Sequence, residues 1–256
     1  MLKSSLLTLT YRISRIAIHT TIGLVIAACM LPFINSHTKL DLIKWWCRGL
    51  LRAFNIRVVT YGNLPATNIK GVMFVANHIS WSDIHALNSV IPLRFIAKSD
   101  IKSWPIFGYL VQKAGTLFID RSKRQEAGRI VEATFESLLA GDNVCFFPEG
   151  TTTDGKQVLP FKSSVLQAAI NANTLICPVA IKYLHSDGSI NNAMAYAGDT
   201  TLMESMHQVL MQKNPVVELH FLMPIRANQY DRRKLSSAAY KAIKDKLDNS
   251  ITKLYL

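Results

Sequence analysis

A histidine precedes an aspartate by five positions in the segment NHISWSD, which covers residues 77–83. A carboxylate beside an imidazole fixes the tautomer of the ring and stabilises its protonated form, so this pair suits a general base. His78 and Asp83 would point about 140° apart on a regular helix, so they cannot cooperate within one. The Ser-x-x-Asp pattern predicts instead that Ser80 is the N-cap of a helix and that His78 lies in the loop before it. Taken alone, the segment fits a capping aspartate next to a loop histidine better than a catalytic pair.

A second motif, FPEGT at positions 147–151, follows an apolar run that predicts a strand. Ligands of α/β proteins gather at the carboxyl ends of strands. Gly150 would let the backbone approach a ligand closely, and the turn amides with the hydroxyl of Thr151 could hold an anion. The two motifs together suggest a base that activates a hydroxyl group beside a site that holds the molecule carrying it. The alternative for the second motif is an ordinary polar turn.

The His-x4-Asp pattern followed by FPEGT resembles the PlsC-type glycerolipid acyltransferases, which acylate lysophosphatidate. Residues 98–121, with PIFG and GTLFIDR inside them, are similar to the second block of that family, and ICPVAI at 176–181 is similar to its fourth. A lone His-x4-Asp arises often by chance, whereas four blocks in order across residues 77–181 are a specific signal. The resemblance implies a 1-acylglycerol-3-phosphate O-acyltransferase, which makes phosphatidic acid.

The resemblance also implies roles for individual residues. His78 would remove the proton of the acceptor hydroxyl, which attacks an acyl thioester, and Asp83 would orient the base. The FPEGT turn, with Glu149, Gly150 and Thr151, is associated in the family with the glycerol-phosphate part of the acceptor. The donor would be acyl-CoA or acyl carrier protein as a substrate, with no cofactor. No metal is expected, because the histidines are dispersed and form no ligand-spaced cluster.

One departure from the family pattern concerns the acceptor. Many members carry Arg directly after FPEGT, whereas this chain has Thr152, which cannot make the bidentate phosphate contact of a guanidinium. Either Lys98 and Arg121 supply the charge, with Arg121 just before a second capping-box pattern, or the acceptor is another lysolipid. FPEGTT-x-DG followed by LPFK at 159–162 is more similar to the branch that acylates lyso-ornithine lipid.

Other function classes remain alternatives. A lyso-ornithine lipid O-acyltransferase is the nearest one. A lipid hydrolase that activates water with the same His/Asp pair is more distant, as is a non-enzymatic membrane-surface binding protein. Nucleic acid is not expected as a partner, because the sequence contains no recognition-helix or RNP-like pattern.

The N-terminal segment predicts contact with a membrane. Residues 16–38 contain no Lys, Arg, Asp or Glu, and the apolar run at 16–34 is long enough for a span. A helix that lies in one leaflet is the alternative, since His19 and Pro32 dilute the run. A signal peptide is a further alternative, but the run continues past its small residues, which favours a retained anchor. The net charge of +12 favours anionic lipid headgroups as partners.

The cellular side and the fold follow from other patterns. The four cysteines are scattered without a C-x-x-C pair, and three of them have apolar surroundings, which indicates buried free thiols in a reducing compartment. We expect an active site that faces the cytoplasm. From residue 56 onward, strand-like and helix-like segments alternate, which predicts an α/β fold with a largely parallel sheet covered by helices. The clearest helical patterns lie at 123–140 and 161–172. We expect residues 1–54 to form a membrane-anchoring helical segment and residues 55–256 an α/β acyltransferase domain.

Overall fold

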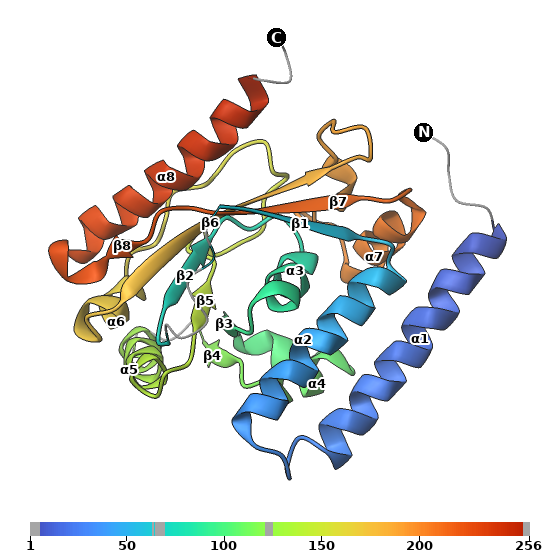
Figure 1. The fold of residues 1–256 in the computed structure, drawn as a ribbon, viewed down its shortest axis with the longest axis horizontal. Coiled ribbons are helices and arrows are strands. Elements are labelled where there is room, and N and C mark those ends of the chain that lie inside the picture. The colour runs from blue at the N-terminus through green and yellow to red at the C-terminus, as the bar shows by residue number, and fades with distance from the viewer. Residues whose placement is uncertain (1–5, 63, 65–69, 121–124, 253–256) are drawn as a thin grey trace.

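The computed structural model describes residues 6–62, 64, 70–120 and 125–252, and its centre is one mixed sheet (Figure 1). The eight-stranded sheet has the order β1-β7-β6-β2-β5-β3-β4, and β8 pairs with β6. The strands are β1 (Arg57–Gly62), β2 (Met73–Ala76), β3 (Arg94–Lys98), β4 (Leu117–Ile119), β5 (Val144–Phe146), β6 (Leu175–Leu184), β7 (Val216–Phe221) and β8 (Ile225–Arg226).

The direction of the strands brings several loops to one edge. Strands β2 to β6 run parallel to their neighbours in this group, while β7 and β8 are antiparallel to β6 and β1 follows β7. The expected largely parallel sheet is therefore confirmed. Because β2, β3, β4 and β5 are parallel, their carboxyl ends lie at the same edge, where side chains that follow different strands can meet.

Helices cover both faces of the sheet. They are α1 (Leu6–Cys29), α2 (Ser36–Ala53), α3 (Ser82–Val90), α4 (Phe107–Lys113), α5 (Glu126–Leu139), α6 (Leu166–Asn171), α7 (Leu202–Met211) and α8 (Arg232–Thr252). Figure 1 shows α5, α6 and α8 on one side and α1 to α4 with α7 on the other. Side chains alternate along β2 accordingly: Phe74 packs with Leu87 of α3, whereas Met73 and Val75 pack with Leu166 of α6.

The first two helices form an antiparallel pair that packs on the domain. The ring of His19 stacks on Trp46 with centroids 5.6 Å apart, and each side chain also bonds the backbone carbonyl of the other residue. Gly23 permits this close packing, because a Cβ there would lie 2.2 Å from the indole nitrogen of Trp46. Arg12 is buried and donates to the carbonyl oxygens of Leu210 and Gln212 at 2.6 and 2.9 Å. These contacts hold α1 along its length against the body of the protein.

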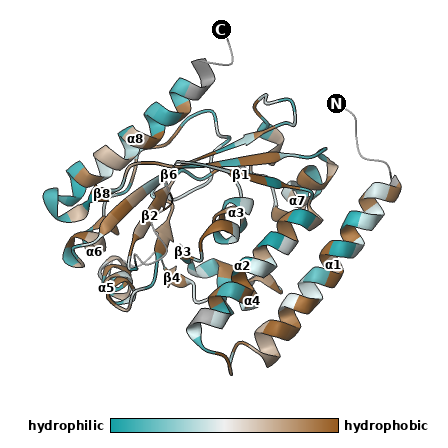
Figure 2. Cartoon of the chain, in the orientation of Figure 1, coloured by the Kyte–Doolittle hydropathy of each residue, from teal (hydrophilic) through white to brown (hydrophobic). Residues whose placement is uncertain are grey.

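An apolar surface remains on the outside of this helix pair. Within the described residues, α1 is the one helix that is long and apolar enough to cross a membrane, and little of it is buried. Ile18, Val25 and Phe33 are among its exposed large side chains and those of the turn that follows. Figure 2 shows that the half of α1 nearest this turn is its most apolar part. The segment therefore remains a candidate membrane anchor.

Candidate active site

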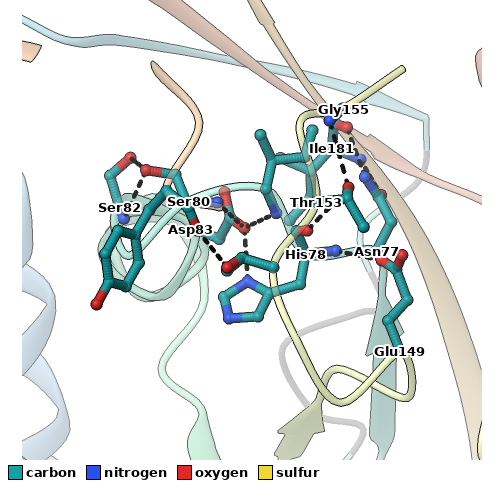
Figure 3. Close-up of polar contacts among 12 residues, drawn as sticks. Asn77, His78, Ser80, Ser82, Asp83, Glu149, Thr153, Gly155 and Ile181 are labelled. Carbon is teal, nitrogen blue, oxygen red and sulfur yellow. Dashed lines mark hydrogen bonds and ion pairs between the residues drawn. The ribbon is translucent and has the colours of Figure 1, made fainter. Parts of the chain in front are cut away.

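The loop between β2 and α3 folds His78 back onto Asp83 (Figure 3). The Nδ1 atom of His78 lies 2.8 Å from Oδ2 of Asp83, and the same oxygen accepts the backbone N–H groups of Ile79 and Ser80 at 2.8 and 2.9 Å. Asp83 is completely buried, while the side chain of His78 is 18% exposed. Asp83 therefore fixes the Nδ1 edge of the ring. Nε2 of His78 has no partner within the described part of the chain and points away from the carboxylate.

The start of α3 differs slightly from the prediction. The helix begins at Ser82 with Trp81 as its N-cap, so the prediction of Ser80 as the N-cap is wrong by one residue. Half of the capping box is still present, because the carboxylate of Asp83 accepts the N–H of Ser80. The hydroxyl of Ser80 instead accepts from the hydroxyl of Ser82 at 3.1 Å. The carboxylate of Asp83 thus bonds both the loop backbone and the ring of His78, which fixes the turn before the helix.

The second oxygen of Asp83 has a partner from a distant strand. The hydroxyl of Tyr183 on β6 donates to Oδ1 at 2.6 Å and also lies 2.8 Å from the hydroxyl of Ser82. Burial, followed by the charge of Asp83, raises the pKa of Tyr183 well above its usual range, so the phenol keeps its proton. The sequence prediction missed Tyr183. Its position could have indicated it, because Tyr183 lies two residues beyond the segment 176–181 and therefore on the same face of the strand as Ile181.

Two aromatic rings support the base. The imidazole of His78 stacks on Phe147 with a centroid distance of 3.8 Å and an interplanar angle of 7°. Phe147 in turn stacks on Phe95 of β3 at 5.9 Å. These contacts fix the plane of the imidazole from one side, so its position depends on three neighbouring parallel strands.

Glu149 is turned into the protein. Its Oε1 accepts the backbone N–H of His78 at 2.7 Å, its Oε2 accepts that of Leu159 at 2.8 Å, and the residue is 4% exposed. Burial is the largest influence and raises the pKa of Glu149 to about 7, against the opposing effect of the two N–H donors. Both carboxylate oxygens thus hold the loop that carries His78 against the FPEGT turn. The expected contact of Glu149 with substrate stays a prediction.

The remaining residues of the turn have different environments. Gly150 has a φ of 76°, in the left-handed region that favours glycine. Thr151 is exposed, and its hydroxyl has no partner among the described residues. The hydroxyl of Thr152 points inward and donates to the carbonyl oxygen of Tyr196. The N–H of Thr153 donates to the carbonyl oxygen of His78 at 2.8 Å, which gives the base loop a second tie to the turn.

Of the two cationic residues predicted from the sequence, the structure describes one, Lys98, at the carboxyl edge of the sheet. Lys98 is exposed at the carboxyl end of β3. Arg121 lies outside the described residues. A hollow of about 290 Å³ opens between Phe147, Gly150 and Lys162. Lys162 belongs to the LPFK segment but was not predicted as a site residue; its backbone N–H bonds the carbonyl oxygen of Pro148 at 2.9 Å, which holds it near the turn.

Known proteins resemble this chain over the segment that contains these site residues. Residues 55–182 match the family model described as Acyltransferase. The chain is 37% identical over 204 residues to a 1-acyl-sn-glycerol-3-phosphate acyltransferase of Neisseria meningitidis, covering 80% of this chain and 76% of the relative. It is 34% identical over 203 residues to a lyso-ornithine lipid O-acyltransferase of Pseudomonas aeruginosa, covering 79% and 77%. The chain belongs to the acyltransferase family.

A solved structure shows the same fold. The crystal structure of the 1-acyl-sn-glycerophosphate acyltransferase PlsC from Thermotoga maritima superposes with a TM-score of 0.72, covers 95% of each chain and is 19% identical in sequence. This structure confirms the fold class, while the family match and the two relatives confirm the resemblance to PlsC-type proteins and the enzyme class.

The acyltransferase also contains an apolar cleft that two stacked phenylalanines separate from His78. It lies between the first four helices and β3, and its lining includes Ile26, Leu42, Ile84, Phe95, Leu110 and Ala114. Phe95 connects this cleft through Phe147 to the ring of His78. His85 also lines the cleft, and its burial lowers its pKa to about 4, so this second histidine stays neutral at physiological pH. The cleft is thus an uncharged space that ends near the candidate base.

No metal-binding group was found in the described part of the acyltransferase. Within that part, no three His, Cys, Asp or Glu side chains come close enough together to hold a metal ion.

Proposed function

We propose that this acyltransferase is a 1-acylglycerol-3-phosphate O-acyltransferase that uses His78 as its general base. The observation that carries this proposal is the 2.8 Å contact between Nδ1 of His78 and the completely buried carboxylate of Asp83. Nε2 of His78 takes the proton from the free hydroxyl of the lysolipid, and that oxygen attacks the thioester carbonyl of the donor. The tetrahedral intermediate expels the thiolate, which recovers the proton from the imidazolium. The donor is acyl-CoA or acyl carrier protein.

The two serines near the base do not serve as nucleophiles in this mechanism. Ser80 and Ser82 are both buried, and their hydroxyls bond each other and Tyr183. Neither hydroxyl contacts the imidazole of His78, whose Nδ1 is occupied by Asp83. Direct attack by the acceptor hydroxyl therefore fits this geometry better than an acyl-enzyme intermediate.

The apolar cleft receives the acyl chain in this proposal. A hydrocarbon chain gains about 0.8 kcal/mol for each methylene that leaves water, so an uncharged, mostly apolar cleft favours it. The contact of Phe95 with Phe147, which supports His78, places one wall of the cleft beside the base. The thioester carbonyl would then lie at the mouth of the cleft.

The acceptor headgroup would lie at the hollow near the FPEGT turn. Gly150 lines the hollow, and Lys162 adds a cation to the predicted Lys98 and Arg121. The hydroxyl of Thr151 is available as a donor. These groups suit the phosphate of lysophosphatidate.

Thr152 favours a second candidate acceptor, lyso-ornithine lipid. Its hydroxyl is engaged with Tyr196, so position 152 offers no cation and no free donor to a phosphate. An ornithine headgroup carries an amino group and a carboxylate in place of the phosphate. It would therefore need fewer cationic contacts at the turn.

The N-terminal helices support a location at the membrane. Because Arg12 ties α1 to the end of α7, α1 lies along the domain, and its exposed apolar residues would enter one leaflet. The acyl acceptor is itself a membrane lipid and would reach the cleft from that leaflet. We place the active site on the cytoplasmic side, where both soluble donors are present.

The test is acyl transfer from acyl-CoA and acyl-carrier protein to lysophosphatidate and lyso-ornithine lipid. We expect transfer to lysophosphatidate by the wild type and at least a 10²-fold loss in His78→Ala, the usual scale for a general base. His207→Ala, an exposed histidine on α7, is the matched control and should keep full activity. Transfer only to lyso-ornithine lipid would show that this lipid is the acceptor and would leave the proposed mechanism unchanged. Transfer that survives His78→Ala would refute the base.

A further inference from the structure

A basic groove lies away from the base, where α1, α2, β1 and the end of α3 meet. We define it by four exposed arginines, Arg15, Arg48, Arg52 and Arg57. None of the described residues that line it is an aspartate or glutamate. The concentration of uncompensated positive charge in one concave surface indicates an anionic partner.

The guanidinium groups are held at the rim but are not neutralised. Arg48 donates through Nε to the carbonyl oxygen of Ser89, and Arg15 lies over the ring of Tyr11 at 5.5 Å. The side chains of Arg52 and Arg57 have no hydrogen-bond or ion-pair partner within the described residues. All four can therefore contact a ligand without breaking an ion pair of the protein itself.

The groove is unlike a site for a single phosphate. Such sites usually combine helix N-termini or free backbone N–H groups around one point. Here α2 and α3 both end at the groove, so their carbonyl ends face it. The N–H groups of Asn55, Ile56 and Arg57 are already bonded to carbonyl oxygens. The positive charge comes only from separate arginines on three elements, which matches a partner whose negative charges are also spread out.

The surface between the arginines is partly apolar and partly polar, and its uncharged polar residues include Asn55, Thr60 and Ser89. Apolar side chains lie between them. They include Leu51, Ile56, Val58, Val90 and Val216, of which the first two and the last are buried. A basic rim around a surface of mixed polarity is complementary to the acidic face of a helix that also carries some apolar side chains. The groove has a volume of about 790 Å³ and is open at the surface, so a helix can lie on it.

We propose that this groove docks the acidic surface of an acyl carrier protein that delivers the acyl chain. The proposal rests on the proposed function, because it names the donor of that same reaction. α3 connects the two places: Asp83 lies in its first turn and Ser89 in its last, about 9 Å along the helix. An extended phosphopantetheine arm can span such a separation and carry the thioester from the docked protein toward His78.

The experiment compares donors with a charge-reversed groove. In Arg52→Glu/Arg57→Glu we expect the KM for acyl-carrier protein to rise about tenfold or more, with an unchanged kcat, because attraction becomes repulsion. The KM for acyl-CoA should change less than about twofold. Lys241→Glu/Lys244→Glu on α8 alters the net charge equally and should leave both KM values as in the wild type.

Direct binding separates this proposal from the mechanism. Anisotropy of labelled acyl-carrier protein is measured on the inactive His78→Ala protein with and without the groove substitutions, so no turnover is needed. Tight binding that the groove substitutions weaken supports the proposal even if no acceptor is acylated. An equal rise in KM for both donors would assign the groove to phosphates of CoA. Loss of binding to anionic vesicles with an unchanged KM for acyl-carrier protein would assign it to lipid headgroups. Either result overturns the proposal.

Discussion

At the scale of single residues, the carboxylate of Asp83 is the most highly bonded group of the site. Its oxygens lie beside Nδ1 of His78 and accept hydrogen bonds from two backbone N–H groups and from the hydroxyl of Tyr183. A buried carboxylate with this many donors cannot rotate away from the imidazole. The orientation of the base is therefore set before substrate binds.

Tyr183→Phe tests this arrangement. Removal of the hydroxyl takes away a hydrogen bond to a charged group, which is typically worth about 1.5–3 kcal/mol. We expect kcat to fall about tenfold or more, with little change in KM, since Tyr183 is buried and its hydroxyl donates to Asp83. Tyr230→Phe, near the start of α8, is the matched control. Unchanged kcat in Tyr183→Phe would show that the loop backbone alone orients Asp83.

Glu149 predicts a pH dependence of stability. Its pKa of about 7 in the folded chain exceeds the ordinary value of 4.5, so the folded state binds this proton more tightly than the unfolded state. Its contribution to stability is therefore complete below about pH 4.5 and is lost as pH rises through about 7. Between pH 5 and pH 8 the wild type should lose more free energy of unfolding than Glu149→Gln, as measured by urea unfolding in detergent. Parallel changes in the two proteins would contradict the raised pKa.

Some of these residue roles could be predicted from the sequence and others could not. His78 and Asp83 are close in sequence, and their residue types suffice to suggest a pair. The contact of Tyr183 with Asp83 spans 100 residues and depends on the register between β2 and β6, which no local pattern contains. The inward turn of Glu149 likewise depends on N–H groups of His78 and Leu159.

At the scale of elements, apolar runs located the strands well, while helix limits were less accurate. The helical pattern at 161–172 corresponds to a helix only at Leu166–Asn171. Residues 161–163 have no regular structure and residues 164 and 165 form a turn. The N–H of Lys162 bonds the carbonyl oxygen of Pro148 instead of a helical partner. β8, a strand of two residues, was not predicted, since a segment this short has no periodicity.

The apolar cleft between helices gives a prediction about acyl chains. Ala114 follows α4 and lines the cleft. Ala114→Trp should fill part of it and exclude the end of a long chain. The loss of two buried methylenes costs about 1.6 kcal/mol, so kcat/KM for a C16 donor should fall about tenfold or more relative to a C10 donor. Leu139→Trp on the exposed end of α5 is the control, and equal ratios in both variants would place the chain elsewhere.

At the scale of the whole molecule, positive charge and an exposed apolar helix act together. The net charge is +12, and α1 carries exposed Ile18, Ile22 and Val25. Charge attraction to anionic lipid is screened by salt, whereas burial of apolar side chains is not. Membrane association should therefore have one part that depends on salt and one part that does not.

Vesicle sedimentation measures both parts. Binding to vesicles with anionic lipid should weaken between about 0.05 and about 0.5 M salt, because the screening length shortens to a few ångströms. A residual fraction should stay bound at high salt, and binding to neutral vesicles should not depend on salt. Complete release at high salt would mean that α1 does not enter the lipid.

In the turn that follows β5, some residues hold the loop that carries His78 and another bonds a different segment. This difference bears on how such enzymes diverge. Glu149 and Thr153 hold the loop that carries His78, while the side chain of Thr152 between them donates to the carbonyl oxygen of Tyr196. A lineage can therefore exchange the residue at position 152 without disturbing the catalytic pair. In the proposed acceptor site, one substitution at position 152 would change the contact offered to the headgroup and leave the contact between His78 and Asp83 in place. This would explain why a single chain resembles relatives with two different acceptors almost equally, at 37% and 34% identity.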